Sequence, residues 1–138
     1  MQKDVTSRGI VIDNDEVILM YRVKNGNEYY AIPGGHIESN ETLEECLIRE
    51  IREEYNINID IISFLGKIER DNNIEYIYNC KWIDGILSLA GEEKEYNNKD
   101  NYYEIKRIKI KDIDSINLYQ DNRDMIRKAV KERRDINE

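Results

Sequence analysis

The chain concentrates carboxylates in one short stretch. Residues 34–57 read GGHIESNETLEECLIREIREEYNI and hold seven glutamates, namely Glu38 and a closer group of six, Glu41, Glu44, Glu45, Glu50, Glu53 and Glu54. Within that stretch only Arg49 and Arg52 balance them. Two carboxylates about 6 Å apart repel by roughly 3 kcal/mol at an effective dielectric of about 20. A hard divalent cation such as Mg²⁺, which prefers oxygen ligands, would turn this repulsion into coordination.

A helix over about residues 42–55 is predicted to position these carboxylates. An apolar stripe recurs every four residues, at Leu43, Leu47, Ile51 and Tyr55. Asn40 or Thr42 can cap the start of the helix. Glu45 follows Thr42 by three residues, which is the spacing of a capping box.

Three of the glutamates share one arc of this helix. At about 100° per residue, Glu53 and Glu54 fall about 60° and 40° to either side of Glu50, so we expect all three beside the apolar stripe. Glu53 and Glu54 also lie in the last turn, where the helix dipole favours cations by about 0.3–1 kcal/mol each. Such breaches of local rules are typical of functional sites. The alternative is incidental clustering on a surface helix, which the excess of acids disfavours.

The segment before the helix is predicted to be a β-meander over residues 8–32. The turn between its first two strands is expected at residues 13–15, and a hairpin turn at residues 25–27, which read Asn-Gly-Asn. Pro33-Gly34-Gly35 is then expected to break regular structure.

The segment after the helix is predicted to add three strands and a final helix. Strands are expected over residues 57–69, 74–83 and 102–110, with a polar, acidic loop region at 84–101 that could hold a short strand. The last helix, over residues 121–134, has an apolar face formed by Met125, Ile126, Ala129 and Val130. This order predicts one mixed α/β domain over residues 1–138.

The carboxylate-rich stretch resembles the Nudix box, Gx5Ex7REUxEExGU, in which U is an aliphatic residue. Gly35, Glu41 and residues 49–57 match every defined position except one, where Asn56 replaces the glycine. Asparagine tolerates the left-handed conformation that ends many helices, so we expect a small loss of stability and intact chemistry. The order of elements around the box is also similar to that of Nudix domains, which implies an α/β/α sandwich with a central mixed sheet.

The resemblance implies hydrolysis of a diphosphate linkage by water attack at phosphorus, with Mg²⁺ or Mn²⁺ as the cofactor. The substrate would be a nucleoside diphosphate linked to another group, or a nucleoside triphosphate. The implied metal ligands are the carboxylates of Glu50, Glu53 and Glu54 and the carbonyl of Gly34. One of the glutamates would also help deprotonate the attacking water.

Two further residues of the box have implied supporting roles in catalysis. Arg49 would orient the glutamates through salt bridges, and its spacing permits contacts with Glu45 and Glu53. Glu41 would lie near Arg49 and hold the geometry between loop and helix. His36, the only histidine, stands at a variable position of the box and is expected to be structural or exposed.

Residues outside the box supply candidates for substrate binding. Arg8 and Arg22 could contact substrate phosphates, with surface salt bridges as the alternative. The candidates to stack on a base are Tyr21, Tyr29, Tyr30, Tyr76, Tyr78 and Trp82, although most strand aromatics pack in cores. Glu93 is the preferred further carboxylate among Glu92, Glu93 and Glu95 of the acidic loop region, and a solvated loop is the alternative.

Composition narrows the class of partner. Hydrophobic residues make up 40% of the 138 residues and charged residues 36%, as in a soluble globular protein. A net charge of -8 repels nucleic-acid backbones, so a small nucleotide is the expected partner. No apolar run is long enough to span a membrane. Cys46 and Cys80 lack metal-type spacing and are expected to be reduced, buried thiols of a cytoplasmic protein.

Two other functions are compatible with a Nudix-type fold. A non-catalytic module that binds nucleotides would be favoured by loss of the box glutamates, which are all present. An isomerase of the isopentenyl diphosphate type would need a catalytic cysteine in a convincing position and a longer chain. The proline that ADP-ribose hydrolases often carry about 16 residues after the box is absent, which disfavours ADP-ribose as the substrate. The sequence does not decide among the other substrates. A homodimer is compatible with the sequence, which does not decide it.

Overall fold

Seven strands form one mixed sheet in the computed structural model, which describes residues 3–90, 98, 100–119 and 122–136. The strands are β1 (Asp4–Asp13), β2 (Glu16–Lys24), β3 (Asn27–Ala31), β4 (Gly34–His36), β5 (Ile57–Glu69), β6 (Asn73–Gly85) and β7 (Asn101–Lys109). Their order is β3-β2-β1-β6-β5, with β4 paired to β1 and β7 paired to β2. The β1–β6 pair is parallel and the other pairs are antiparallel.

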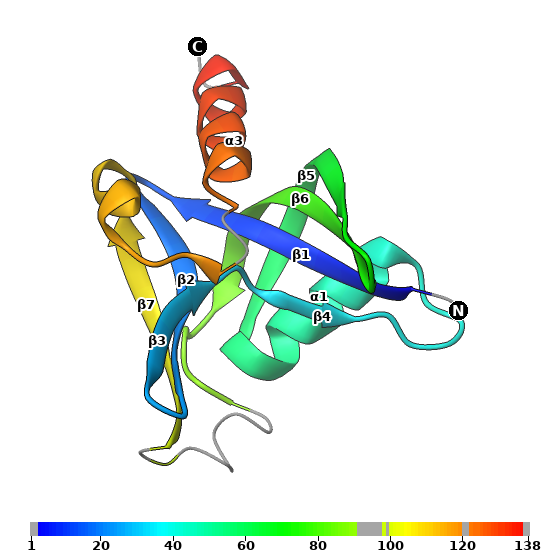
Figure 1. The fold of residues 1–138 in the computed structure, drawn as a ribbon. Helices are drawn as coiled ribbons and strands as arrows, with labels where there is room; N and C mark the ends of the chain where they lie inside the picture. The colour runs from blue at the N-terminus through cyan, green and yellow to red at the C-terminus, as the bar shows by residue number, and fades with distance from the viewer. Residues whose placement is uncertain (1–2, 91–97, 99, 120–121, 137–138) are drawn as a thin grey trace.

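Strand β1 joins two wings of the sheet that diverge from each other (Figure 1). Its first half pairs with β4 through Thr6, Ser7 and Arg8, whereas only its end, at Ile12 and Asp13, pairs with β2. The wing of β3, β2 and β7 therefore separates from the wing of β4, β1, β6 and β5. This divergence creates the space in which the candidate site lies.

Two helices cover opposite faces of the sheet, α1 (Leu43–Tyr55) and α3 (Arg123–Ile136). Side chains of β1 alternate between them: Ile10 and Ile12 belong to the core beneath α3, while Val11 belongs to the core beneath α1. Such alternation follows from the two-residue period of a strand. The predicted α/β/α sandwich is therefore confirmed, as is the buried face of the last helix.

The ends of α1 follow the sequence prediction. Thr42 is the N-cap, and a complete capping box joins it to Glu45. Asn56 ends the helix in the left-handed conformation, with φ 61° and ψ 30°. Its side-chain amide donates to the carbonyl of Ile86 at 2.9 Å, a bond that glycine could not make.

The structure corrects two details of the predicted elements. Residues 34–36 form the short strand β4, where the glycines were expected to end regular structure, because their backbone pairs with β1. The strand after the acidic loop region ends at Lys109, and a 3₁₀ helix, η1 (Ile110–Ser115), follows it. Residues 86–90 have no regular structure, and the rest of that loop lies largely outside the described residues.

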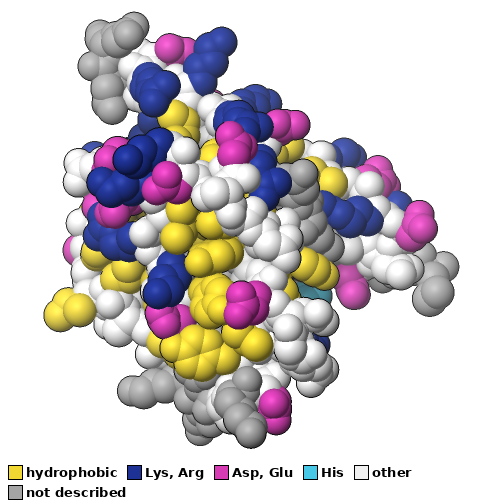
Figure 2. Space-filling model, turned by 60° about the vertical axis from the view of Figure 1, so that its left-hand side comes forward, with side chains coloured by type: hydrophobic (Ala, Val, Ile, Leu, Met, Phe, Trp, Pro, Cys, Tyr) yellow, Lys and Arg dark blue, Asp and Glu magenta, His cyan; other side chains and the backbone are white. Residues whose placement is uncertain are grey.

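Charge is unevenly spread over the surface. On the face shown in Figure 2, lysine and arginine gather toward the end of the molecule that carries α3, with acidic side chains among them. Within the described part of the chain, no helix is long and apolar enough to cross a membrane. Cys46 and Cys80 are both free and buried, in agreement with the prediction for these thiols.

Candidate active site

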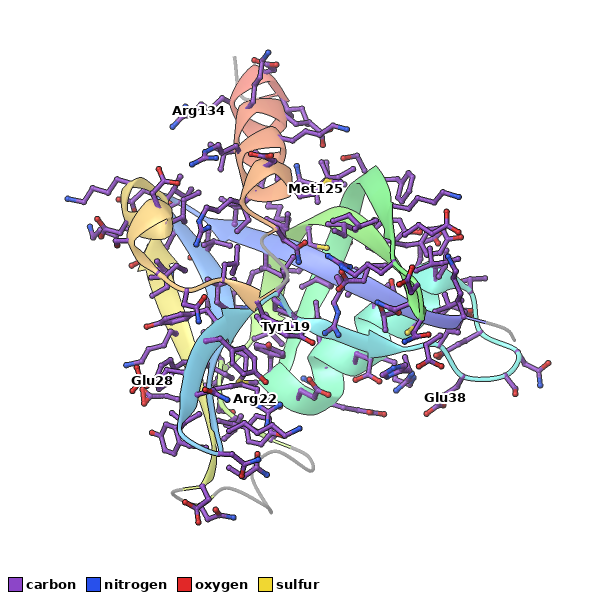
Figure 3. The ribbon with its side chains drawn as sticks, viewed as in Figure 1. Arg22, Glu28, Glu38, Tyr119, Met125 and Arg134 are labelled. Atoms are coloured by element: carbon purple, nitrogen blue, oxygen red, sulfur yellow. The ribbon has the colours of Figure 1, made fainter. Side chains whose placement is uncertain are left out.

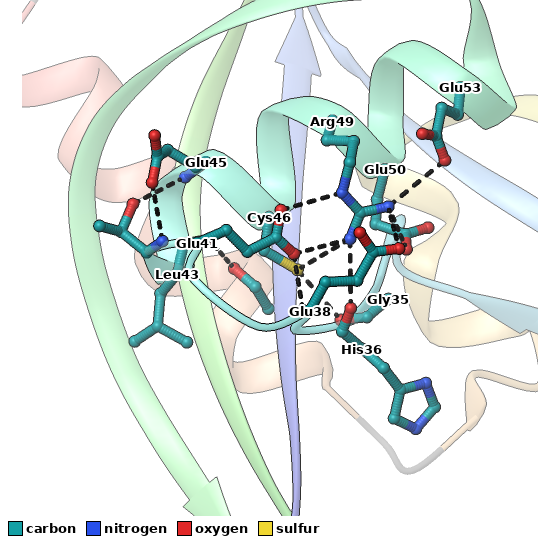
Figure 4. Close-up of polar contacts among 12 residues, drawn as sticks. Gly35, His36, Glu38, Glu41, Leu43, Glu45, Cys46, Arg49, Glu50 and Glu53 are labelled. Atoms are coloured by element: carbon teal, nitrogen blue, oxygen red, sulfur yellow. Dashed lines mark hydrogen bonds and ion pairs between the residues drawn. The ribbon is translucent and has the colours of Figure 1, made fainter.

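Arg49 is the centre of a network of carboxylates on α1 and the loop before it (Figure 4). Its Nε and Nη2 donate to the two carboxylate oxygens of Glu41, at 2.9 and 2.7 Å. Its Nη1 lies 3.1 Å from Glu50 Oε1 and 3.3 Å from Glu53 Oε2. Its Nη2 also donates to the His36 carbonyl at 3.3 Å. Its Nη1 also lies 3.6 Å from Glu38 Oε1, so one guanidinium contacts four glutamates. The predicted contacts of Arg49 with Glu41 and Glu53 are confirmed.

The paired charges of Arg49 and Glu41 strengthen each other. The hydrogen bond from Arg49, followed by one from the backbone N–H of Glu38, lowers the pKa of Glu41 to about 2. The same hydrogen bond raises the pKa of Arg49 above its usual value. The expected contact with Glu45 is not formed, because that carboxylate accepts from the backbone N–H of Thr42 at 2.8 Å. Both residues of the Arg49–Glu41 pair are therefore fully charged near neutral pH.

Two glycines let the backbone approach the carboxylates closely. A Cβ on Gly35 would lie 2.4 Å from Glu50 Cδ and 2.6 Å from each of its carboxylate oxygens. A Cβ on Gly34 would lie 2.0 Å from the carbonyl oxygen of Ser7, and Gly34 has a φ of +143°, which other residues rarely adopt. The double glycine is thus required by the contact of β4 with both β1 and Glu50.

A cavity of about 560 Å³ lies between the two wings of the sheet and α1. Acidic side chains line it on the side of α1 and its preceding loop, namely Glu38, Glu50 and Glu54. Cationic and aromatic side chains line it on the strands, namely Arg8, Arg22, Lys24, Tyr29 and Tyr103. Its volume is typical of sites for small ligands such as nucleotides.

The two candidate phosphate-binding arginines both line this cavity, but they differ in their partners. Arg8 Nε lies 3.3 Å from Glu75 Oε1, and the Glu75 side chain is only 3% exposed. Arg22 Nη1 donates to the Tyr29 hydroxyl at 3.2 Å, and Nη2 donates to Asn101 Oδ1 at 2.7 Å. Arg8 therefore contacts a buried carboxylate, which it shares with Arg70, whereas these hydrogen bonds of Arg22 are with neutral groups.

The structure separates the three predicted metal ligands of α1. Glu50 is largely buried, with a side chain 14% exposed, and it lines the cavity together with Glu54. Glu53 has a side chain 57% exposed and is absent from the described lining, so the expectation that it lies at the edge of the buried face is wrong. Its position on the wheel is closer to the solvated side because α1 packs through Leu47 and Ile51.

The other predicted site residues also differ in whether they line the cavity. His36 is exposed at the rim of the cavity, in agreement with the prediction. Among the aromatic candidates only Tyr29 lines the described cavity, while Tyr103 and Tyr119, which the sequence did not single out, also line it. Tyr103 pairs with Arg22 across the sheet, a contact that depends on the register of β2 and β7. Glu92, Glu93 and Glu95 lie outside the described residues.

The oxygen atoms available at the cavity suit a hard divalent ion whose remaining ligands come from the substrate. Glu50 and Glu54 face the cavity beside Gly34 and Gly35, so carboxylate and carbonyl oxygens are available and no thiolate is among the lining residues. Within the described part of the chain, no three acidic, histidine or cysteine side chains form a ready-made metal cluster. Mg²⁺ commonly binds through one or two carboxylates, with water and substrate phosphates as its other ligands. The residues fit that mode of binding.

Comparison with known proteins identifies the class to which this fold and site belong. The family model of the NUDIX domain matches residues 3–129, so the chain belongs to the NUDIX domain family. A solved NUDIX-family hydrolase from Clostridium perfringens superposes with a TM-score of 0.74 at 20% identity, covering 95% of this chain and 98% of that one. The resemblance seen in the box therefore extends to the whole fold.

Two curated relatives carry names that describe an activity. An ADP-ribose pyrophosphatase from Methanocaldococcus jannaschii is 32% identical over 93 residues, which are 62% of this chain and 55% of the relative. An RNA pyrophosphohydrolase from Halorhodospira halophila is 34% identical over 62 residues, covering 45% of this chain and 34% of the relative. The matched part thus spans about half of the first relative's length and about a third of the second's.

Proposed function

We propose that this chain is a metal-dependent pyrophosphohydrolase that cleaves the diphosphate linkage of a nucleotide. Its substrate is a nucleoside diphosphate linked to a further group, or a nucleoside triphosphate. The observation that carries the proposal is the position of Glu50, a largely buried carboxylate held against the backbone of Gly35 at the wall of a nucleotide-sized cavity. The relatives named as pyrophosphatase and pyrophosphohydrolase support the same reaction class.

The metal would be held by oxygen atoms at the acidic side of the cavity. Glu50, Glu54 and the Gly34 carbonyl are the proposed ligands, and Glu53, whose carboxylate accepts from Arg49, is a further proposed ligand. When bound, Mg²⁺ or Mn²⁺ neutralises charge on the diphosphate and lowers the pKa of a bound water. One of the three glutamates would accept the proton of the water that attacks phosphorus.

Arg49 and Glu41 act as positioning residues in this proposal. Their bidentate pair fixes the guanidinium, and the guanidinium in turn contacts Glu50, although Arg49 is not among the residues that line the cavity. Arg8 would contact a phosphate near Gly34, and the direct pairing of these two residues between β1 and β4 supports this role. The two buried, free cysteines agree with action in the reducing cytoplasm, on a small nucleotide partner.

Product release from a panel of substrates tests the proposal. Nucleoside diphosphate sugars and nucleoside triphosphates are incubated with Mg²⁺ or Mn²⁺, and products are identified by chromatography with mass detection. Glu50→Gln should lower kcat by at least about a hundredfold, because it removes a charge that acts at the reacting centre. Glu69→Gln, at an exposed glutamate of β5 paired with Lys3, is the matched control and should retain full activity.

Two outcomes would count against the proposed enzyme. Turnover that Glu50→Gln leaves unchanged would place the chemistry elsewhere. Absence of turnover across the panel, with Mg²⁺ still raising the melting temperature of the wild-type protein, would instead favour a nucleotide-binding module.

A further inference from the structure

Arg22 lies in a row of side chains that crosses three strands. It is the direct partner of Tyr29 on β3 and of Tyr103 on β7. Its guanidinium carbon lies 3.9 Å from the centre of the Tyr103 ring and 5.8 Å from that of Tyr29. Hydrogen bonds to the Tyr29 hydroxyl and to Asn101 hold the guanidinium in place. Figure 3 shows Arg22 and Tyr119 well separated from Glu38, so this row and the acidic loop lie at different parts of the cavity wall.

The charge of Arg22 is not balanced by a carboxylate within the described residues. Arg107 is the informative contrast, because it also stacks on an aromatic ring, with 5.4 Å to Trp82, yet it pairs with Asp13 at 2.6 Å and Glu16 at 2.8 Å. Arg22 Nε is a buried donor that has no hydrogen-bond partner among the residues that the structure describes. A half-buried cation in such a position is a ready partner for an anion, and charge-assisted bonds from a guanidinium are strong.

Lys24 adds a second cation to the same wall. It stands two residues after Arg22 on β2, so both side chains lie on one face of the strand and line the cavity. No ion pair of Lys24 is found within the part of the chain that the structure describes. In a chain with a net charge of -8, two adjacent cations without carboxylate partners indicate a ligand that brings negative charge.

Arg22 lies apart from the residues proposed to hold the cleaved linkage. In the proposed function that linkage lies beside Gly34 and Glu50, where Arg8 is the adjacent cation and contacts Glu75, a carboxylate that it shares with Arg70. Arg22 has no pairing with β4 and lies on the other wing of the sheet. A flat base is a poorer occupant of this spot, because the guanidinium already covers the face of Tyr103 and a neutral ring would leave both cations unbalanced.

We propose that Arg22 and Lys24 bind a phosphate group of the substrate that is separate from the phosphorus under attack, an inference that rests on the proposed pyrophosphohydrolase function. Arg22 and Lys24 therefore select substrates with an additional phosphate. This chemistry is shared by the outer phosphate of a nucleoside triphosphate and by a phosphate monoester on the group linked to a nucleoside diphosphate.

Binding of inorganic pyrophosphate without metal tests the anion site independently of catalysis. Titration calorimetry in EDTA at low salt should show binding to the wild-type protein. Because the acidic side of the cavity repels phosphate when no cation is present, this binding reports on Arg22 and Lys24. Arg22→Gln should weaken this affinity by about tenfold to a hundredfold. Arg107→Gln is the matched control and should bind as the wild type does. No binding to the wild type, or equal binding by Arg22→Gln, would overturn the inference.

Kinetics distinguish the two sources of the phosphate. If the site takes the outer phosphate, Arg22→Gln should raise KM for nucleoside triphosphates about tenfold or more, with kcat within about twofold. If it takes a monoester, the same change should appear for a nucleoside diphosphate sugar phosphate and not for its unphosphorylated form. An equal effect on substrates with and without the additional phosphate would contradict the inference. If no substrate is turned over, the proposed function fails, and the calorimetry still decides the anion site.

Discussion

Two walls of one cavity handle charge in opposite ways. On α1 and its preceding loop, Arg49 is surrounded by carboxylates from Glu41, Glu50 and Glu53, and acids are in excess. On β2, β3 and β7, Arg22 is held by a hydroxyl, an amide and an aromatic ring. The first wall, the acidic wall, therefore has an excess of negative charge, and the second, the cationic wall, has an excess of positive charge. In the proposed function, a metal-bound phosphate substrate would complete both.

The two walls also differ in how the chain assembles them. The carboxylate partners of Arg49 lie at most 11 residues from it in sequence, Glu38 being the most distant. Arg22 donates hydrogen bonds to Tyr29, which lies seven residues away across a hairpin, and to Asn101, which lies 79 residues away on β7. A short motif thus encodes the acidic wall, whereas strand register alone creates the cationic one.

Gly35→Ala should displace Glu50 from the acidic wall and leave Arg22 and Lys24 of the cationic wall in place. The added Cβ would lie within 2.6 Å of the Glu50 carboxylate, which is the far end of a flexible side chain and can turn away. We expect kcat to fall about a hundredfold or more, because Glu50 leaves its position, while the free energy of unfolding changes by only about 1 kcal/mol. Steady-state kinetics and urea unfolding measure the two effects.

Gly26→Ala is the control for this substitution. Gly26 has a φ of +84°, and nothing lies within 4 Å of the place that an added Cβ would occupy, so alanine there brings backbone strain of about 1–2 kcal/mol and no steric clash. Its activity should stay at the wild-type value per folded molecule. Metal-free pyrophosphate affinity should be unchanged in both variants. Loss of that affinity in Gly35→Ala would show that the two walls are not separate.

The acidic wall was largely predictable from the sequence because its contacts are local. The four-residue stripe and the capping box indicated the helix, and helical spacing brought Arg49 within reach of Glu53. The left-handed conformation of Asn56 followed from the same local rules. What failed here was the exposure of Glu53, because its angle was compared with that of Glu50 and not with the buried face: helical spacing puts Glu53 about 120° from Leu47 and about 160° from Ile51.

The cationic wall was only partly predictable. Arg22 and Tyr29 could be named as separate candidates, but their meeting with Tyr103 depends on the pairing of β2 with β7. No local turn joins β2 to β7, so the sequence offers no turn that sets their register. The strand β4 was missed for a similar reason, since it forms through pairing with β1 and not through the propensity of its glycines.

A smaller effect is expected at the end of α1, the helix that carries the acidic wall. Asn56→Ala should lower the free energy of unfolding by about 1–2 kcal/mol, because alanine is disfavoured in the left-handed conformation and loses the bond to Ile86. Asn56→Gly should stay within about 1 kcal/mol of the wild type, since relief of backbone strain offsets the lost bond. Urea unfolding followed by circular dichroism measures both. Equal destabilisation by the two variants would mean that the side-chain bond, and not the backbone conformation, ends the helix.

The smallest expected effect is a difference in how the two walls respond to acid. The hydrogen bond from Arg49 lowers the pKa of Glu41 to about 2, well below the usual value of a free glutamate, which is about 4.3. A lowered folded-state pKa contributes stability that is present above the unfolded-state value and is lost as pH falls toward the folded-state value. The gap in melting temperature between wild type and Glu41→Gln should therefore shrink as pH falls from about 5 toward 2. The gap between wild type and Arg22→Gln should stay level over the same range, because the described partners of Arg22 are a hydroxyl and an amide and include no carboxylate. A constant gap for Glu41→Gln, or a shrinking one for Arg22→Gln, would remove the electrostatic distinction between the walls.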